Sequence, residues 1–117
     1  MRCIRLKPGA EDVELIDIPS GLGSLQMEVG GMIQAVYPWN DPVGLICNEE
    51  GKINEMEACC ILADQKGRVY DIVHGPMLIV GLGEENFTDL TEEQVELMRG
   101  RIKKLNRQFV AFTDVEG

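Results

Sequence analysis

The amino-acid sequence predicts an α+β domain: a curved antiparallel sheet of five or six short strands, with one short helix and one C-terminal amphipathic helix. Two observations carry this prediction. Short apolar and β-branched runs recur along the chain, separated by turn-forming Gly, Pro, Asn and Asp. Apolar residues at helical spacing stand out in only two stretches. A length of 117 residues fits a single domain, residues 1–117.

The first two strands are predicted as a hairpin over residues 2–6 and 13–18. Pro8 and Gly9 lie between these runs and provide the turn signal. Acidic residues interrupt the apolar positions of the second run, as expected for a strand with one face in water.

A short helix is predicted next. Leu22, Leu25 and Val29 recur at i, i+3 and i+7, which places them on one helix face. Gly30 and Gly31 follow and supply a left-handed stop.

The middle of the chain predicts a second hairpin, over residues 32–37 and 43–47. Two prolines stiffen its tip, because proline cannot donate to a strand ladder. Residues 54–62 fit either one or two helical turns or irregular structure. Residues 69–73 form another β-prone run, and residues 76–82 are apolar enough to form a central strand.

The last helix is predicted at about residues 92–106. Thr91 and Gln94 form a capping box, and Leu90 with Val95 forms a hydrophobic staple. Gly100 implies either a close neighbour or a weakened helix. The β-prone run at residues 109–112 would then add an edge strand, contact a partner or fray.

The composition is acidic, with 20 Asp and Glu against 11 Lys and Arg and a net charge of −9. This charge disfavours direct binding to DNA or RNA. Residues 1–98 carry a net charge of −12 and residues 99–117 carry +3. A polarised molecule of this kind could form a homodimer in which the basic end of one subunit meets the acidic body of another.

The sequence predicts a cytoplasmic protein. The N-terminus lacks the apolar core of a signal peptide. The most apolar run, residues 76–82, is far shorter than the roughly 20 residues needed to span a membrane. Without an export signal, the four cysteines are expected to stay reduced.

Several segments, taken in order, resemble the domain-of-unknown-function 3846 family over about residues 1–98. They are Gly30-Gly31, Leu45 to Lys52, Val69 to Val73, Leu78 to Leu82, and the acidic Phe87 segment leading to Leu90 to Gln94. The most specific piece is Cys47-Asn48-Glu49-Glu50-Gly51. The chain departs from the family pattern at Ala58-Cys59-Cys60 and at His74-Gly75-Pro76. The resemblance implies a small intracellular protein of bacteria, phages or conjugative elements, without a catalytic motif.

Reactive or metal-binding chemistry has little support. The sole histidine, His74, lacks partners at metal-ligand spacing, so neither a metal nor a cofactor is predicted. A Cys47–His74–Asp71 nucleophile would need a thiol beside a base, yet Asp71 and His74 should point to opposite faces of a strand.

Gly81-x-Gly83 resembles a phosphate loop, but two glutamates follow it and would repel an anion. No catalytic residue is therefore predicted.

A binding surface is the stronger prediction. Aromatic residues on the stiff tip of the second hairpin are suited to an interface centre, although the lone Trp39 could equally form a lid over its own core. The predicted binding residues are Tyr37, Trp39, Asn48, Glu49, Glu50 and His74.

Three functions remain open. The first is a non-enzymatic acidic binding module of a phage or mobile element that engages a host protein as an anti-defence or regulatory factor. The second is a binder that sequesters a nucleotide-like small molecule in a pocket or at a subunit interface. The third is a cysteine-dependent enzyme.

Overall fold

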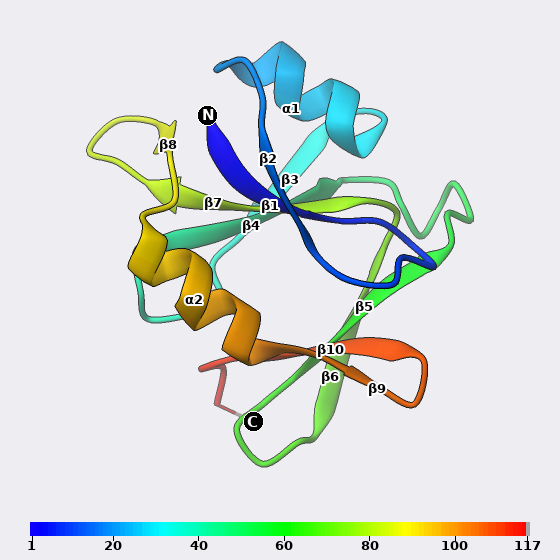
Figure 1. Cartoon of the computed structure of the whole chain (residues 1–117). Helices are drawn as coiled ribbons and strands as arrows, with labels where there is room; N and C mark the ends of the chain where they lie inside the picture. Colours follow the sequence, from blue (N-terminus) through cyan, green and yellow to red (C-terminus); the bar gives the residue numbers. More distant parts are fainter. Residues whose placement is uncertain (117) are drawn as a thin grey trace.

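The computed structural model describes residues 1–116 and has two helices and ten strands among them (Figure 1). In chain order these are β1 (Arg2–Leu6), β2 (Glu14–Asp17), α1 (Leu22–Val29), β3 (Ile33–Val36), β4 (Val43–Asn48), β5 (Ala58–Ala63), β6 (Val69–His74), β7 (Met77–Leu82), β8 (Phe87–Thr88), α2 (Glu92–Arg101), β9 (Ile102–Leu105) and β10 (Gln108–Phe112). The α+β class is confirmed. Within residues 1–116, neither helix has the length and the apolar composition of a membrane-spanning helix.

The larger sheet is antiparallel and has six strands. Its order is β2-β1-β7-β4-β3, and β8 pairs with the C-terminal end of β7. Strand β7 lies in the middle of this sheet, as predicted. Its side chains are buried on both faces of the sheet, which explains its continuous apolar sequence. Helix α1 covers one face, where Leu25 and Val29 pack near Leu78 and Val80.

The smaller sheet has the order β6-β5-β10-β9, and β10 runs parallel to β5. The sequence does not predict this second sheet. The segment at residues 54–62 ends in strand β5. Strand β10 is an interior strand of this sheet, whereas the sequence left an edge strand, a partner contact or a frayed end open for residues 109–112. Figure 1 shows the two sheets stacked, with α2 along one side of the space between them.

The main core lies between the two sheets. Leu45 and Ile79 of the larger sheet, Leu62 and Phe109 of the smaller sheet and Met98 of α2 belong to one buried cluster. The strands β4 and β7 thus place alternate side chains toward α1 and toward this core.

Helix α2 begins as predicted but ends early. Thr91 and Gln94 form both hydrogen bonds of the capping box. The prediction that the helix continues to about residue 106 is wrong, because Ile102 is extended and residues 102–105 pair with β10. Asn106 and Arg107 turn the chain back with φ of +50° and +69°. Gly100 is exposed and has open space around it, so no close neighbour explains it.

Candidate functional site

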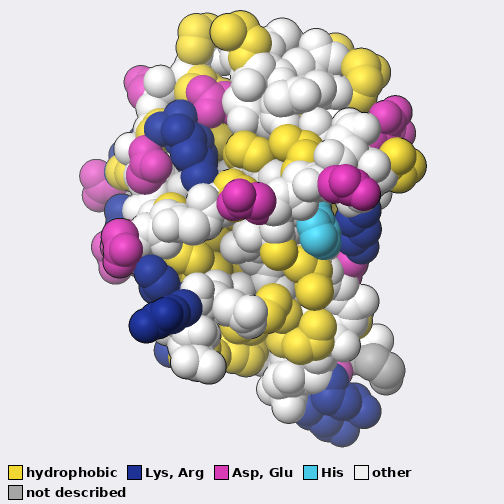
Figure 2. Space-filling model, turned by 90° about the vertical axis from the view of Figure 1, so that its right-hand side faces the viewer, with side chains coloured by type: hydrophobic (Ala, Val, Ile, Leu, Met, Phe, Trp, Pro, Cys, Tyr) yellow, Lys and Arg dark blue, Asp and Glu magenta, His cyan; other side chains and the backbone are white. Residues whose placement is uncertain are grey.

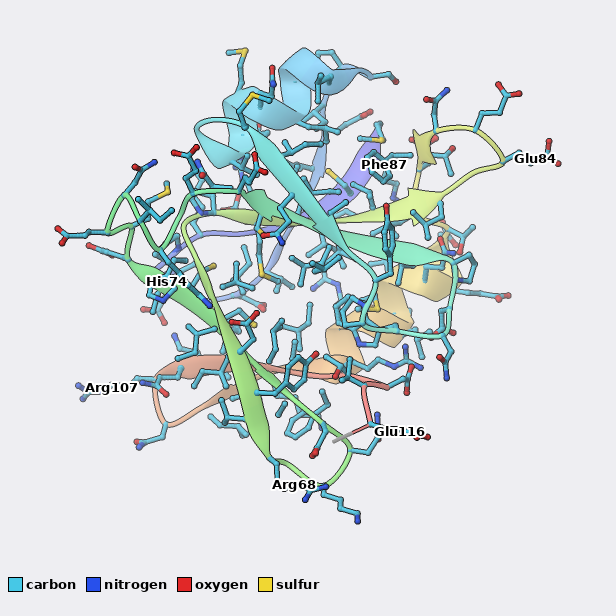
Figure 3. All side chains as sticks on the ribbon, turned by 180° about the vertical axis from the view of Figure 1, so that it is seen from behind. Arg68, His74, Glu84, Phe87, Arg107 and Glu116 are labelled. Carbon is cyan, nitrogen blue, oxygen red and sulfur yellow. The ribbon has the colours of Figure 1, made fainter. Side chains whose placement is uncertain are left out.

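A cleft of about 480 Å³ opens between β3 and β6, the strands at the ends of the two sheets. Strands β3 and β4 and the 49–53 turn provide one wall, and β6 with Leu62 of β5 provides the other. Figure 3 views this side of the molecule and labels His74 near the end of β6. The cleft is lined by Gln34, Val36, Tyr37, Pro38, Cys47, Asn48, Glu49, Gly51, Lys52, Ile53, Leu62, Tyr70, Asp71, Ile72, Val73, His74 and Val115.

The cleft runs along the edge of β6. Five consecutive residues of this strand, from Tyr70 to His74, line it. The amide of Ile72 bonds to the side chain of Asp71, which also lines the cleft, and this indicates that the outer edge of β6 borders the cleft there. This geometry also explains why Asp71 and His74 both border the cleft, although side chains three apart were expected on opposite faces.

Exposed apolar side chains gather at this cleft. Tyr37 is 58% exposed and Tyr70 is 43% exposed, and Ile53 and Val115 also reach the surface there. In Figure 2 the sole histidine lies beside acidic and basic side chains, and hydrophobic side chains reach the surface below it. Aromatic side chains at a concave surface are typical of binding sites.

Asp71 and Lys52 form an ion pair at the cleft. Lys52 Nζ lies 2.5 Å from Asp71 Oδ1, and the same oxygen accepts a 2.8 Å hydrogen bond from the amide of Ile72. Burial alone would raise the pKa of Asp71. These two hydrogen bonds outweigh it, so the pKa is lowered and the carboxylate stays charged.

The cleft also contains the thiol of Cys47 and the imidazole of His74. Burial, and then the charge of Asp71, raise the pKa of Cys47. His74 Nδ1 lies 2.9 Å from the backbone oxygen of Met56. Among the described residues no hydrogen bond joins Cys47 to His74. Burial therefore disfavours the thiolate form of Cys47 that a cysteine nucleophile requires.

The structure brings Tyr37, Asn48, Glu49 and His74 together at the cleft, as four of the six predicted binding residues. Trp39 is corrected to a core lid: it is 4% exposed, and its Nε1 donates a 2.8 Å hydrogen bond to the Phe112 carbonyl. The loop around Trp39 is held against the C-terminal segment, because the Asp114 amide donates to the Pro38 carbonyl and the Asn40 amide donates to the Asp114 carboxylate.

Asn48 and Glu50 have structural contacts that the sequence does not reveal. The Asn48 side chain donates to the Val29 carbonyl and accepts from the Glu50 amide, so both of its polar groups are occupied. Glu50 is exposed but does not line the cleft. Of these three neighbours, Glu49 alone offers the cleft an uncommitted polar side chain.

Sequence reasoning missed Lys52, Ile53 and Tyr70 as cleft residues. Their sequence neighbourhoods indicate only a turn and a strand, and the cleft arises where two sheet edges meet. No group of three or more potential metal ligands lies close together within residues 1–116.

The comparisons with known proteins give one match. The family model described as "Domain of unknown function (DUF3846)" matches residues 1–106. The search of curated proteins and the search of solved structures give no match.

Proposed function

The chain belongs to the DUF3846 family, and we propose that it is a non-enzymatic binding module that engages a protein partner through the cleft between β3 and β6. The observation that carries this proposal is the group of exposed apolar side chains around that cleft: Tyr37, Ile53, Tyr70 and Val115. Apolar side chains scattered singly need no explanation, but a cluster at a concave surface favours an interaction site.

The charge supports a basic partner. The protein carries a net charge of −9, and four of the five charged residues in the 49–57 segment beside the cleft are acidic. Opposite charge on the partner would speed association and select against acidic proteins. The family resemblance implies a small intracellular protein of bacteria, phages or conjugative elements, and our proposal adds that this protein acts on a host protein in defence or regulation.

Photo-crosslinking tests this proposal. A photoreactive phenylalanine derivative replaces Tyr37 in one variant and Leu22 on α1 in a matched control, because the two side chains are similarly exposed, at 58% and 55%. In bacterial lysate, position 37 should crosslink to specific proteins, and the yield should fall at high salt because exposed charges are screened. Equal adduct patterns from positions 37 and 22 would contradict the proposal.

A second candidate is the sequestration of a nucleoside-like small molecule. The cleft volume of about 480 Å³ is within the range of small-ligand sites, and Tyr37 could stack on a base. The acidic surroundings favour an uncharged nucleoside over a phosphorylated one. Thermal unfolding with a panel of nucleosides and nucleotides tests this candidate, because a ligand at 100 times its Kd stabilises a protein by about 2.7 kcal/mol. Shifts by nucleosides that disappear in Tyr37→Ala would favour this candidate over the protein partner.

A further inference from the structure

We infer that the partner segment in this cleft is an extended, basic polypeptide that adds as a further strand along the open edge of β6. The inference rests on the proposed function and specifies its partner. Four features support it: the position of β6 in the sheet, the orientation of the cleft, the apolar side chains beside it and the surrounding charge.

Strand β6 is at the end of its sheet, and within residues 1–116 it pairs with β5 alone. Tyr70, Asp71 and Ile72 border the cleft, and the turn at Gly51 packs against the backbone oxygen of His74 at the end of the strand. An unpaired strand edge can bind an extended chain through backbone hydrogen bonds, and neighbouring side chains then give specificity. The opposite wall includes β3, which is also an end strand, so the occupant would lie between two sheet edges.

The side chains around the edge suit a strand with alternating character. Tyr70 and Ile53 offer exposed apolar surface on the two walls of the cleft. Because the side chains of an added strand alternate between two faces, one set can contact these groups while the other set faces the acidic surface. The edge thus favours an occupant in which apolar and basic residues alternate.

The charged groups at the edge explain the preference for basic residues. Lys52 pairs with Asp71 at 2.5 Å, so this lysine of the cleft does not neutralise the nearby carboxylate of Glu49. Asp71 also accepts the Ile72 amide hydrogen at 2.8 Å and so covers part of the edge in the free protein. Charged residues that cover edges are a common protection against self-association. A lysine or arginine on the incoming strand would give Asp71 a new partner.

A displayed library of random linear peptides is the probe for this inference. Selection on the intact protein should enrich peptides in which Lys or Arg alternates with apolar residues and Pro is rare. Two synthetic versions of the best peptide are then compared. One is N-methylated on the backbone amides of its odd-numbered residues and the other on those of its even-numbered residues. Only one set of amides can face β6, so one methylated peptide should bind about tenfold or more weakly while the other is little changed.

Two further measurements locate the peptide. Amide hydrogen exchange in β6 should slow on binding. Tyr70→Ser should weaken binding, whereas Leu15→Ser on β2, an end strand of the other sheet with a similarly exposed side chain, should not.

Equal affinity of both methylated peptides, protection away from β6, or no enrichment of basic alternating peptides would overturn strand addition. Crosslinking from position 37 reports on the proposed function separately, since it does not depend on how the partner is bound.

Discussion

Asn48 of β4 caps the end of helix α1, because its Nδ2 donates a 3.1 Å hydrogen bond to the carbonyl of Val29. The last carbonyls of a helix lack partners within the helix and need one from outside. Asn48 Oδ1 also accepts the amide hydrogen of Glu50 at 2.7 Å. Residues 48–50 therefore connect a helix end to the turn beside the cleft.

Asn48→Ala should destabilise the protein by about 1–3 kcal/mol, because the Val29 carbonyl and the Glu50 amide would lose their partner in a poorly solvated place. Urea unfolding measures the change in the free energy of unfolding. Asn54→Ala is the matched control: Asn54 is exposed, so its effect should stay within about 0.5 kcal/mol. Equal effects of the two substitutions would show that Asn48 does not have this structural role.

Two glycine substitutions should have opposite signs. A Cβ at Gly51 would clash with the backbone oxygen of His74, which cannot move without shifting β6. Gly51→Ala should therefore destabilise the fold by about 2 kcal/mol or more. A Cβ at Gly100 meets nothing within 4 Å, so Gly100→Ala should stabilise α2 by up to about 1 kcal/mol. Thermal unfolding measures both, and a stabilising Gly51→Ala would contradict the tight packing of the turn on β6.

The local patterns predict much of the fold and little of the cleft. The stop at Gly30 and the capping box at Thr91 are confirmed because they depend on neighbouring residues alone. Residues 102–105 carry apolar spacing that fits a helix or a strand, and pairing with β10 decides between them. The parallel contact of β10 with β5 joins residues almost fifty apart in sequence, which no local pattern reveals. Tyr70 becomes a cleft residue only through that second sheet.

The turn between β9 and β10 holds Arg107 at φ +69°, a conformation that costs an ordinary residue about 1 kcal/mol. Glycine adopts it without this cost, and Asn-Gly is the favoured pair for such hairpin turns. Arg107→Gly should raise the free energy of unfolding by about 0.5–1 kcal/mol. Urea unfolding provides the measurement, and Lys103→Gly within β9 is a control that should destabilise. A destabilising Arg107→Gly would mean that the arginine side chain makes a contact worth more than the backbone strain.

Asp64 should contribute to acid sensitivity. Its carboxylate accepts hydrogen bonds from the amides of Lys66 and Arg68 and from the Arg68 side chain. The Arg68 amide, followed by the other two donors, holds its pKa below the ordinary value of 3.8 despite opposing desolvation. A group with a lowered pKa in the folded state stabilises above its unfolded pKa and loses that effect as pH falls through its folded value. Asp64→Asn should therefore lower stability at neutral pH and flatten the loss of stability below about pH 4. An unchanged pH profile would show that this carboxylate does not control acid unfolding.

The buried thiols should react slowly with alkylating reagents. Burial raises the pKa of Cys3 to about 11 and those of Cys59 and Cys60 to about 12, and it raises the pKa of Cys47 beside the cleft as well. The thiolate is the reactive form, so each cysteine should react with iodoacetamide more slowly than free cysteine at the same neutral pH. Mass spectrometry of digested protein gives the rate at each site, and free cysteine and the unfolded chain provide the reference rates. The Cys47 rate should keep rising with pH above the range where free cysteine levels off. A fast rate that is already constant near neutral pH would reveal a stabilised thiolate and would support the cysteine-enzyme hypothesis over a binding module.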